Sequence, residues 1–224
     1  MIDWRAVHDP TRLDTTRAEL DELGLKHFVD VRATARRMLV SMGRDARTAF
    51  AAAVTERLLR EEEGRPASER GQYLSTWRPV LDAVWRGLAG DPAATGSIAA
   101  GVAHFYLGPD FLQRRHDDPA DADDHAIMAA CFTAECFLHG CLEFAVWVGW
   151  RGFDRATLRT AADRAWPHRR PPEVSPYAWE LAHPEIQAEL DRQLADLELL
   201  SPHGEALPEA PAERRSLLDA LRLG

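Results

Sequence analysis

The chain has 224 residues, 46% of them hydrophobic, and a formal net charge of −9. A chain of this length and composition can bury one core, so we expect a single domain over residues 1–224. Because nucleic-acid binding depends on a basic surface that neutralises phosphates, the acidic balance excludes that class of function and would suit a basic protein partner.

The sequence shows no export signal and no membrane segment. It opens with MIDWRAVHDP, which lacks the basic and apolar regions of a secretion signal. A membrane span needs about 20 apolar residues in a row, whereas the densest apolar stretch of this chain is interrupted by Glu135, His139 and Glu143. We therefore expect a cytoplasmic protein that does not enter the membrane.

Helical signals begin near the N-terminus. Asp9 followed by Pro10 is typical of a helix start, and a narrow leucine stripe then runs to Gly24. Residues 1–29 are therefore expected to form a helical extension. A second helix is expected over residues 30–42, where apolar residues and arginines occupy opposite sides.

An amphipathic helix is predicted over residues 45–64. Phe50, Val54 and Leu58 recur every fourth residue, and alanines lie beside them. Side chains as small as alanine let another helix approach closely. The segment stops at a glycine with a proline beyond it, which is a common end of a helix.

The next two segments differ in how clearly their sequence predicts a helix. Residues 75–90 predict a helix with the most regular apolar stripe of the chain, formed by Trp77, Leu81, Val84, Trp85 and Leu88. Residues 93–108 are rich in alanine and glycine and predict a looser helix, because glycine disfavours helix formation.

The segment from Asp123 to Trp150 is the densest apolar stretch. Its apolar residues fall on almost every helical face, which predicts a helix buried at the centre of the fold. Gly140 leaves two alternatives open, a continuous helix or a hairpin of two helices, because glycine inside a helix costs roughly 1 kcal/mol. Helical structure is expected to continue, or to restart at Asp154, as far as Trp166.

The C-terminal third is also helical. After an extended connection over residues 167–176, His183 and Pro184 open a longer helix, and a tail helix within residues 203–224 either docks or frays. No segment alternates with the period of a strand. The predicted fold is all-α, a single compact multi-helix bundle around a central apolar helix or helical hairpin at about residues 123–165.

Glu135, His139 and Glu143 are the first candidate site. Spaced by four, they form one polar stripe if the helix is continuous. Di-iron centres in helix bundles use Glu-x-x-His with further ligands from other helices, and Glu135, His139 and Glu143 do not have that spacing. A solvated or internally bonded polar stripe is therefore favoured over a metal site. The aspartate-rich loop 116–125 lacks the spacing of a calcium-binding EF-hand.

Trp147 and Trp150 are the second candidate. With Trp166 and Trp179 further along the chain, they either line a ligand pocket or an interface or belong to the core. The five-residue spacing of Cys131, Cys136 and Cys141 prevents convergence on one metal, so we expect buried, reduced thiols. The chain carries no phosphate-binding loop, zinc-protease motif or nucleophile elbow. We therefore expect no catalytic residue, no metal and no cofactor.

Two stretches, AFAAAVTERLL and YLSTWRPVLDAVWRGLAGD, resemble the bacterial YjaG-like family, domain of unknown function 416. Members of that family carry Phe, small residues and Glu-Arg-Leu, followed after a loop by Leu-Asp-x-x-Trp. The corresponding positions here are Phe50, Glu56, Arg57, Leu58, Leu81, Asp82 and Trp85. DDHAIMAACFTAE and HPEIQAELDRQLADL are similar to later helical blocks, so the resemblance covers residues 30–200.

The resemblance implies a compact helical bundle and a turn at Gly140, and it implies no activity, because the family is uncharacterised. It also suggests that Arg57 and Asp82, on the edges of neighbouring apolar stripes, meet as an ion pair.

Three hypotheses for function stay open. The leading one is a non-enzymatic binding protein of the immunity kind, which neutralises a basic partner through an acidic surface. The alternatives are a metal-dependent enzyme that uses the carboxylate and histidine residues, and a homo-oligomer that buries its tryptophan-bearing helices.

Overall fold

The computed structural model describes residues 35–69, 74–108, 123–174 and 176–224. Every regular element in these ranges is helical and none is a strand, which confirms the all-α prediction. None of the helices within them combines the length and the apolar character that a membrane crossing requires. The expected N-terminal extension and most of the aspartate-rich loop lie outside the described residues.

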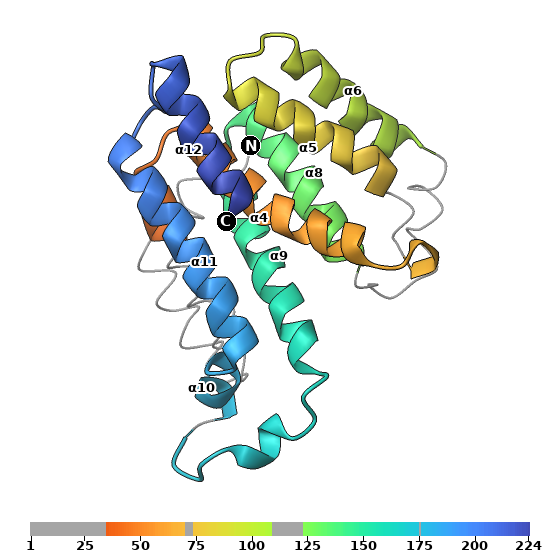
Figure 1. Ribbon diagram of the computed structural model, residues 1–224, viewed down its shortest axis with the longest axis vertical. Helices are drawn as coiled ribbons and strands as arrows, with labels where there is room; N and C mark the ends of the chain where they lie inside the picture. Colours follow the sequence, from red (N-terminus) through yellow and green to blue (C-terminus); the bar gives the residue numbers. More distant parts are fainter. Residues whose placement is uncertain (1–34, 70–73, 109–122, 175) are drawn as a thin grey trace, which may run out of the picture.

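Eight helices carry the described fold (Figure 1). Short 3₁₀ turns lie at Ala67–Glu69, Trp166–Arg169 and Ser201–His203. The helices are α4 (Arg44–Gly64), α5 (Leu74–Leu88), α6 (Ala94–Leu107), α8 (Asp123–His139), α9 (Leu142–Thr160), α10 (Pro176–Leu181), α11 (Pro184–Leu200) and α12 (Pro211–Leu223).

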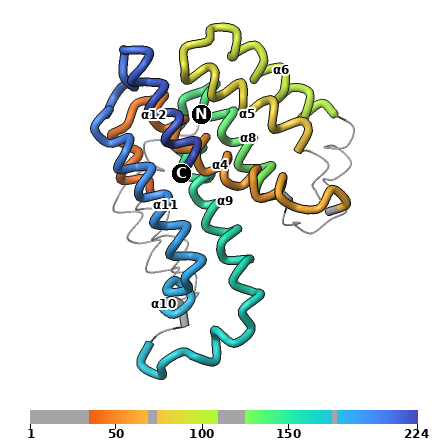
Figure 2. The backbone as a smooth tube through the Cα atoms, in the orientation of Figure 1, coloured from red at the N-terminus to blue at the C-terminus, as the bar shows by residue number. Residues whose placement is uncertain are grey.

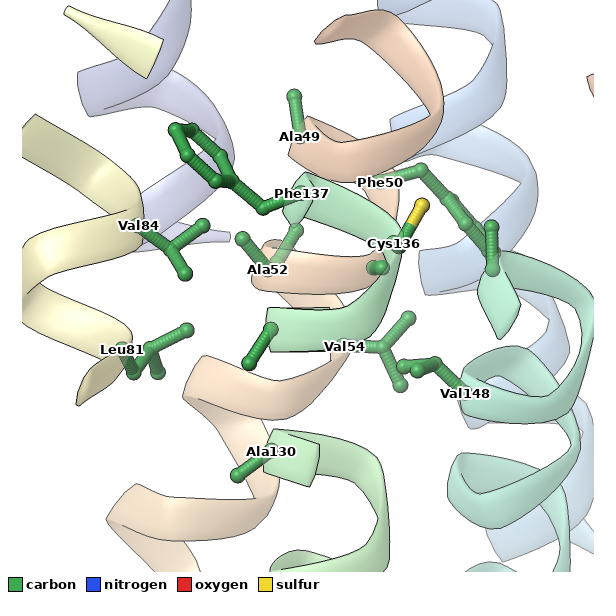
Figure 3. Close-up of a cluster of buried hydrophobic side chains, with 14 of the residues drawn as sticks. Ala49, Phe50, Ala52, Val54, Leu81, Val84, Ala130, Cys136, Phe137 and Val148 are labelled. Atoms are coloured by element: carbon green, nitrogen blue, oxygen red, sulfur yellow. The ribbon is translucent and has the colours of Figure 1, made fainter. Parts of the chain in front are cut away.

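Helix α4 shares the centre of the molecule with α8 and α9. It packs against α5, α8, α9, α11 and α12, and its residues 49–53 are fully buried. Its alanines let five helices crowd around it, so it is buried on more sides than a single amphipathic stripe would give. Figure 3 shows Ala52 and Val54 of α4 among side chains of α5, α8 and α9.

The chain turns at Gly140, so α8 and α9 form a hairpin. Gly140 has a φ of +68°, a conformation that side-chain-bearing residues rarely adopt. Its N–H donates to the Cys136 carbonyl at 2.8 Å. Arginines of α4 complete the turn, because Arg44 donates to the Phe137 carbonyl and Arg47 approaches the Gly140 carbonyl. Of the two alternatives that the sequence left open, the hairpin is the observed one.

The loose helix predicted after residue 93 is a complete helix, α6, packed against α5. Gly101 lies at the contact between the two helices, where a Cβ would lie only 2.3 Å from a methyl carbon of Val80. The glycine therefore allows α6 to lie close to α5. This contact is a packing benefit that offsets the low helical propensity of glycine.

The C-terminal helices cover the opposite side. α11 lies beside α9, and the segment that joins them forms the far end of the molecule (Figure 2). The His183 side chain accepts a hydrogen bond from the Glu185 N–H, so it caps α11 where the sequence placed the helix start. The tail helix α12 docks against α4 through buried Leu217, Leu218 and Leu221.

Candidate functional site

An aromatic cluster lies on the surface of the α8–α9 hairpin. Phe132 of α8 meets Trp147 of α9 edge to face, with ring centroids 5.1 Å apart, and Phe144 lies 6.0 Å from each of them. Phe132 and Phe144 are half-buried, whereas Trp147 is 39% exposed. We call Phe132, Phe144 and Trp147 the hairpin aromatic surface.

The hairpin geometry brings these three rings together. Phe144 and Trp147 are three residues apart, so they lie on neighbouring positions of one face of α9. The turn at Gly140 folds α8 back onto α9 and adds Phe132 to the same face. On a continuous helix Phe132 would lie about 18 Å along the axis from Phe144, at a rise of about 1.5 Å per residue.

Charged pairs border the hairpin aromatic surface at both ends. Near the turn, His139 Nε2 lies 3.1 Å from Glu135, and Arg36 donates to Glu143 at 2.9 Å. One turn beyond Trp147 along α9, Arg151 lies 3.5 Å from Asp154. An exposed aromatic centre inside a polar border is the usual layout of a protein interface.

The second predicted tryptophan belongs to the core. Trp150 is 4% exposed and packs against Phe153 with ring centroids 4.9 Å apart, in a cluster with Ile186 of α11. Helix α11 covers Trp150 and leaves Trp147 uncovered. Of the two candidates, Trp147 alone presents its ring at the surface.

The predicted stripe of Glu135, His139 and Glu143 is divided by the turn. Glu135 pairs with His139 on α8, whereas Glu143 pairs with Arg36, and the His139 side chain is 64% exposed. Within the described residues, no three His, Cys, Asp or Glu side chains are grouped so that they could hold a metal ion.

The predicted ion pair between Arg57 and Asp82 is wrong. Arg57 lies 2.8 Å from Asp196 and 3.8 Å from Glu189, both on α11. Asp82 instead accepts a hydrogen bond from Arg222 of α12 at 2.6 Å. The prediction considered α4 and α5 alone, while the later helices α11 and α12 supply the partners. Burial raises the pKa of the Asp196 carboxyl, and the nearby Arg57 opposes that shift.

The interior contains charged groups that the sequence analysis did not predict. Glu56 is buried, and its carboxylate accepts hydrogen bonds from Arg60 at 3.0 Å, Arg78 at 2.9 Å and Trp85 at 3.0 Å. Arg222 of α12 lies 3.5 Å from the same carboxylate. The interior around the central helices is therefore not wholly apolar. One signal was present, because Glu56 follows Ala49 and Ala53 on the face expected to meet another helix.

Two of the three cysteines follow the prediction of buried, reduced thiols. All three are free, and burial raises the pKa of Cys131 and of Cys136 to about 11, so neither thiol ionises readily. The hydroxyl of Tyr106 lies 2.9 Å from the Cys131 sulfur. Cys141 is exposed, contrary to the prediction, because it lies in the turn after Gly140 rather than inside a helix.

No family model matches the chain, and no curated protein or solved structure matches it. The resemblance to the YjaG-like family therefore stays a prediction.

Proposed function

We propose that this chain is a non-enzymatic binding protein that docks a basic protein partner on the hairpin aromatic surface, in the manner of an immunity protein. The observation that carries the proposal is the exposure of Trp147 in a cluster of three aromatic rings. Tryptophan is enriched among the residues that dominate binding energy at interfaces, especially where polar neighbours exclude water around it.

The three rings are held in place by packing, so they can bind a partner without rearrangement. Phe132 and Phe144 pack against the main core, and Trp147 packs on both of them. Aromatic side chains held in this way lose little further conformational freedom when a partner arrives. The surface therefore supplies apolar contact area at low entropic cost.

The net charge of −9 favours a basic partner. Opposite net charges speed the encounter of two proteins and set its specificity. The same charge disfavours self-association, because two copies of the chain repel one another. A basic protein is therefore a better occupant of this surface than a second copy.

The proposal is tested by capture from lysate of the source cells on the immobilised full-length protein, followed by mass spectrometry. The wild type is compared with Trp147→Ala and with Leu107→Ala, which removes an apolar side chain that is 79% exposed on α6. We expect a basic protein on the wild type and on Leu107→Ala, weakened by added salt, and its loss on Trp147→Ala.

Two results would contradict the proposal. In the first, Trp147→Ala captures the same proteins as the wild type. In the second, light scattering shows that the wild type is a dimer and that Trp147→Ala is a monomer, which assigns the surface to a second copy.

A further inference from the structure

A second region with the features of a binding site lies at the far end of the molecule, where the chain passes from α9 to α11 (Figure 2). A pocket of about 320 Å³ is lined there by Trp166, Trp179, Arg164, Glu180, Asp163 and Arg170, among others. It is separate in sequence from Phe132, Phe144 and Trp147 and does not depend on the function proposed for them.

Two tryptophans form a rigid wall of this pocket. The rings of Trp166 and Trp179 stack with centroids 4.4 Å apart and an angle of 13° between their planes. Each indole N–H donates to the backbone carbonyl of the other tryptophan, at 3.1 Å and 2.8 Å. His183 packs edge-on against Trp166 at 4.7 Å. The indole donors are therefore satisfied, and what the pair offers a ligand is apolar ring surface.

The charged groups of the pocket fall into two kinds. Asp163 accepts from the Ala165 N–H and lies 3.7 Å from Arg169, and Arg170 donates to the Val174 carbonyl. The side chains of Arg164 and Glu180, in contrast, make no hydrogen bond or ion pair within the described part of the chain, either with each other or with another group. One cation and one anion are thus uncommitted in the same small pocket.

We infer that this pocket binds a small zwitterion of the aromatic amino-acid class. The ring of the ligand would lie against the tryptophan wall, its carboxylate would meet Arg164, and its ammonium group would meet Glu180. Guanidinium and carboxylate groups are the usual partners of these two charges. A ligand with only one charge would leave the other protein charge unpaired, so the pocket should prefer the zwitterion.

The test is calorimetric titration of the full-length protein with three probes of similar shape. L-phenylalanine carries both charges, 3-phenylpropionate lacks the ammonium group, and 2-phenylethylamine lacks the carboxylate. We expect saturable binding of L-phenylalanine and binding weaker by about two- to fivefold for each of the other probes, which is the range of a solvent-accessible ion pair.

Variants locate the two contacts. Arg164→Gln should abolish the preference for L-phenylalanine over 2-phenylethylamine, and Glu180→Gln should abolish the preference over 3-phenylpropionate. Glu173→Gln, an exposed carboxylate in the same segment but not in the pocket lining, is the control that should change neither preference.

Absence of saturable binding by all three probes overturns the inference. So does equal binding of the three probes, or a preference for L-phenylalanine that survives both Arg164→Gln and Glu180→Gln.

Discussion

At the scale of single residues, Glu56 is the side chain whose environment differs most from expectation. A buried carboxylate is stable only if its oxygens are fully paired, and Glu56 receives donors from α4 and α5 and has Arg222 of α12 beside it. The charge therefore helps to fix the positions of three helices relative to one another.

Replacement of Glu56 tests this role. Glu56→Gln should lower the free energy of unfolding by about 3 kcal/mol, because it weakens the charge-assisted hydrogen bonds from Arg60, Arg78 and Trp85 and places amide donors of its own in the same buried position. Glu63→Gln is the matched control, since Glu63 also accepts from Arg78, at 2.6 Å, but its side chain is 38% exposed. That variant should lose less than about 1 kcal/mol. Equal losses in urea titrations of the two variants would contradict the role given to Glu56.

His125 is the residue with the clearest predicted pH dependence. Burial, together with the charges of the nearby Arg151 and Arg155, lowers its pKa from 6.5 to about 4. Between these two values the unfolded chain binds a proton at this site and the folded chain does not. The free energy of unfolding should therefore fall as the pH is lowered from 6.5 towards 4.

The contribution of His125 is isolated by comparing variants across that pH range. His125→Gln should show a shallower fall than the wild type when unfolding is followed by urea titration at several pH values. His104→Gln, which changes an exposed histidine of α6, should match the wild type. Identical curves for the wild type and His125→Gln would show that the histidine does not act in this way.

At the scale of elements, Gly140 decides the architecture. Its backbone is in the left-handed region, and a Cβ there would lie 3.2 Å from the Cγ of Arg44. Gly140→Ala should therefore cost about 1–2 kcal/mol of stability. Gly96→Ala should instead stabilise the protein by about 0.5–1 kcal/mol, because Gly96 lies within α6 with open space around it. Stabilisation by both substitutions in thermal unfolding would mean that the turn is not required.

Most helices could be predicted from the sequence because their apolar spacing and end signals are local. Helix α11 begins at Pro184 after the capping residue His183, as that pair of residues predicts, and α12 begins at Pro211, where proline occupies the first helical position. The sequence around Gly140 does not by itself decide between a continuous helix and a hairpin. Arginines of α4, far away along the chain, bind the carbonyls of Phe137 and Gly140 at the turn. The degree of burial of α4 likewise depends on helices that come later in the chain.

At the scale of the whole molecule, the candidate site depends on which faces remain uncovered. The sequence identified Trp147 and Trp150 together, and only the position of α11 distinguishes them. The pairing of Arg57 was missed for the same reason, since its partners lie on α11, more than 100 residues later in the chain. The net charge, in contrast, follows from composition alone, and it predicts that the partner carries a positive charge.

The affinity of the captured partner for the full-length protein, measured by calorimetry for the wild type, Trp147→Ala and Leu107→Ala, tests the central proposal most directly. We expect Trp147→Ala to lose at least about 2 kcal/mol of binding free energy, as a residue at the centre of an interface does. Leu107→Ala should bind as the wild type does, and added salt should weaken both. An affinity unchanged by Trp147→Ala would contradict the assignment of the hairpin aromatic surface as the binding site.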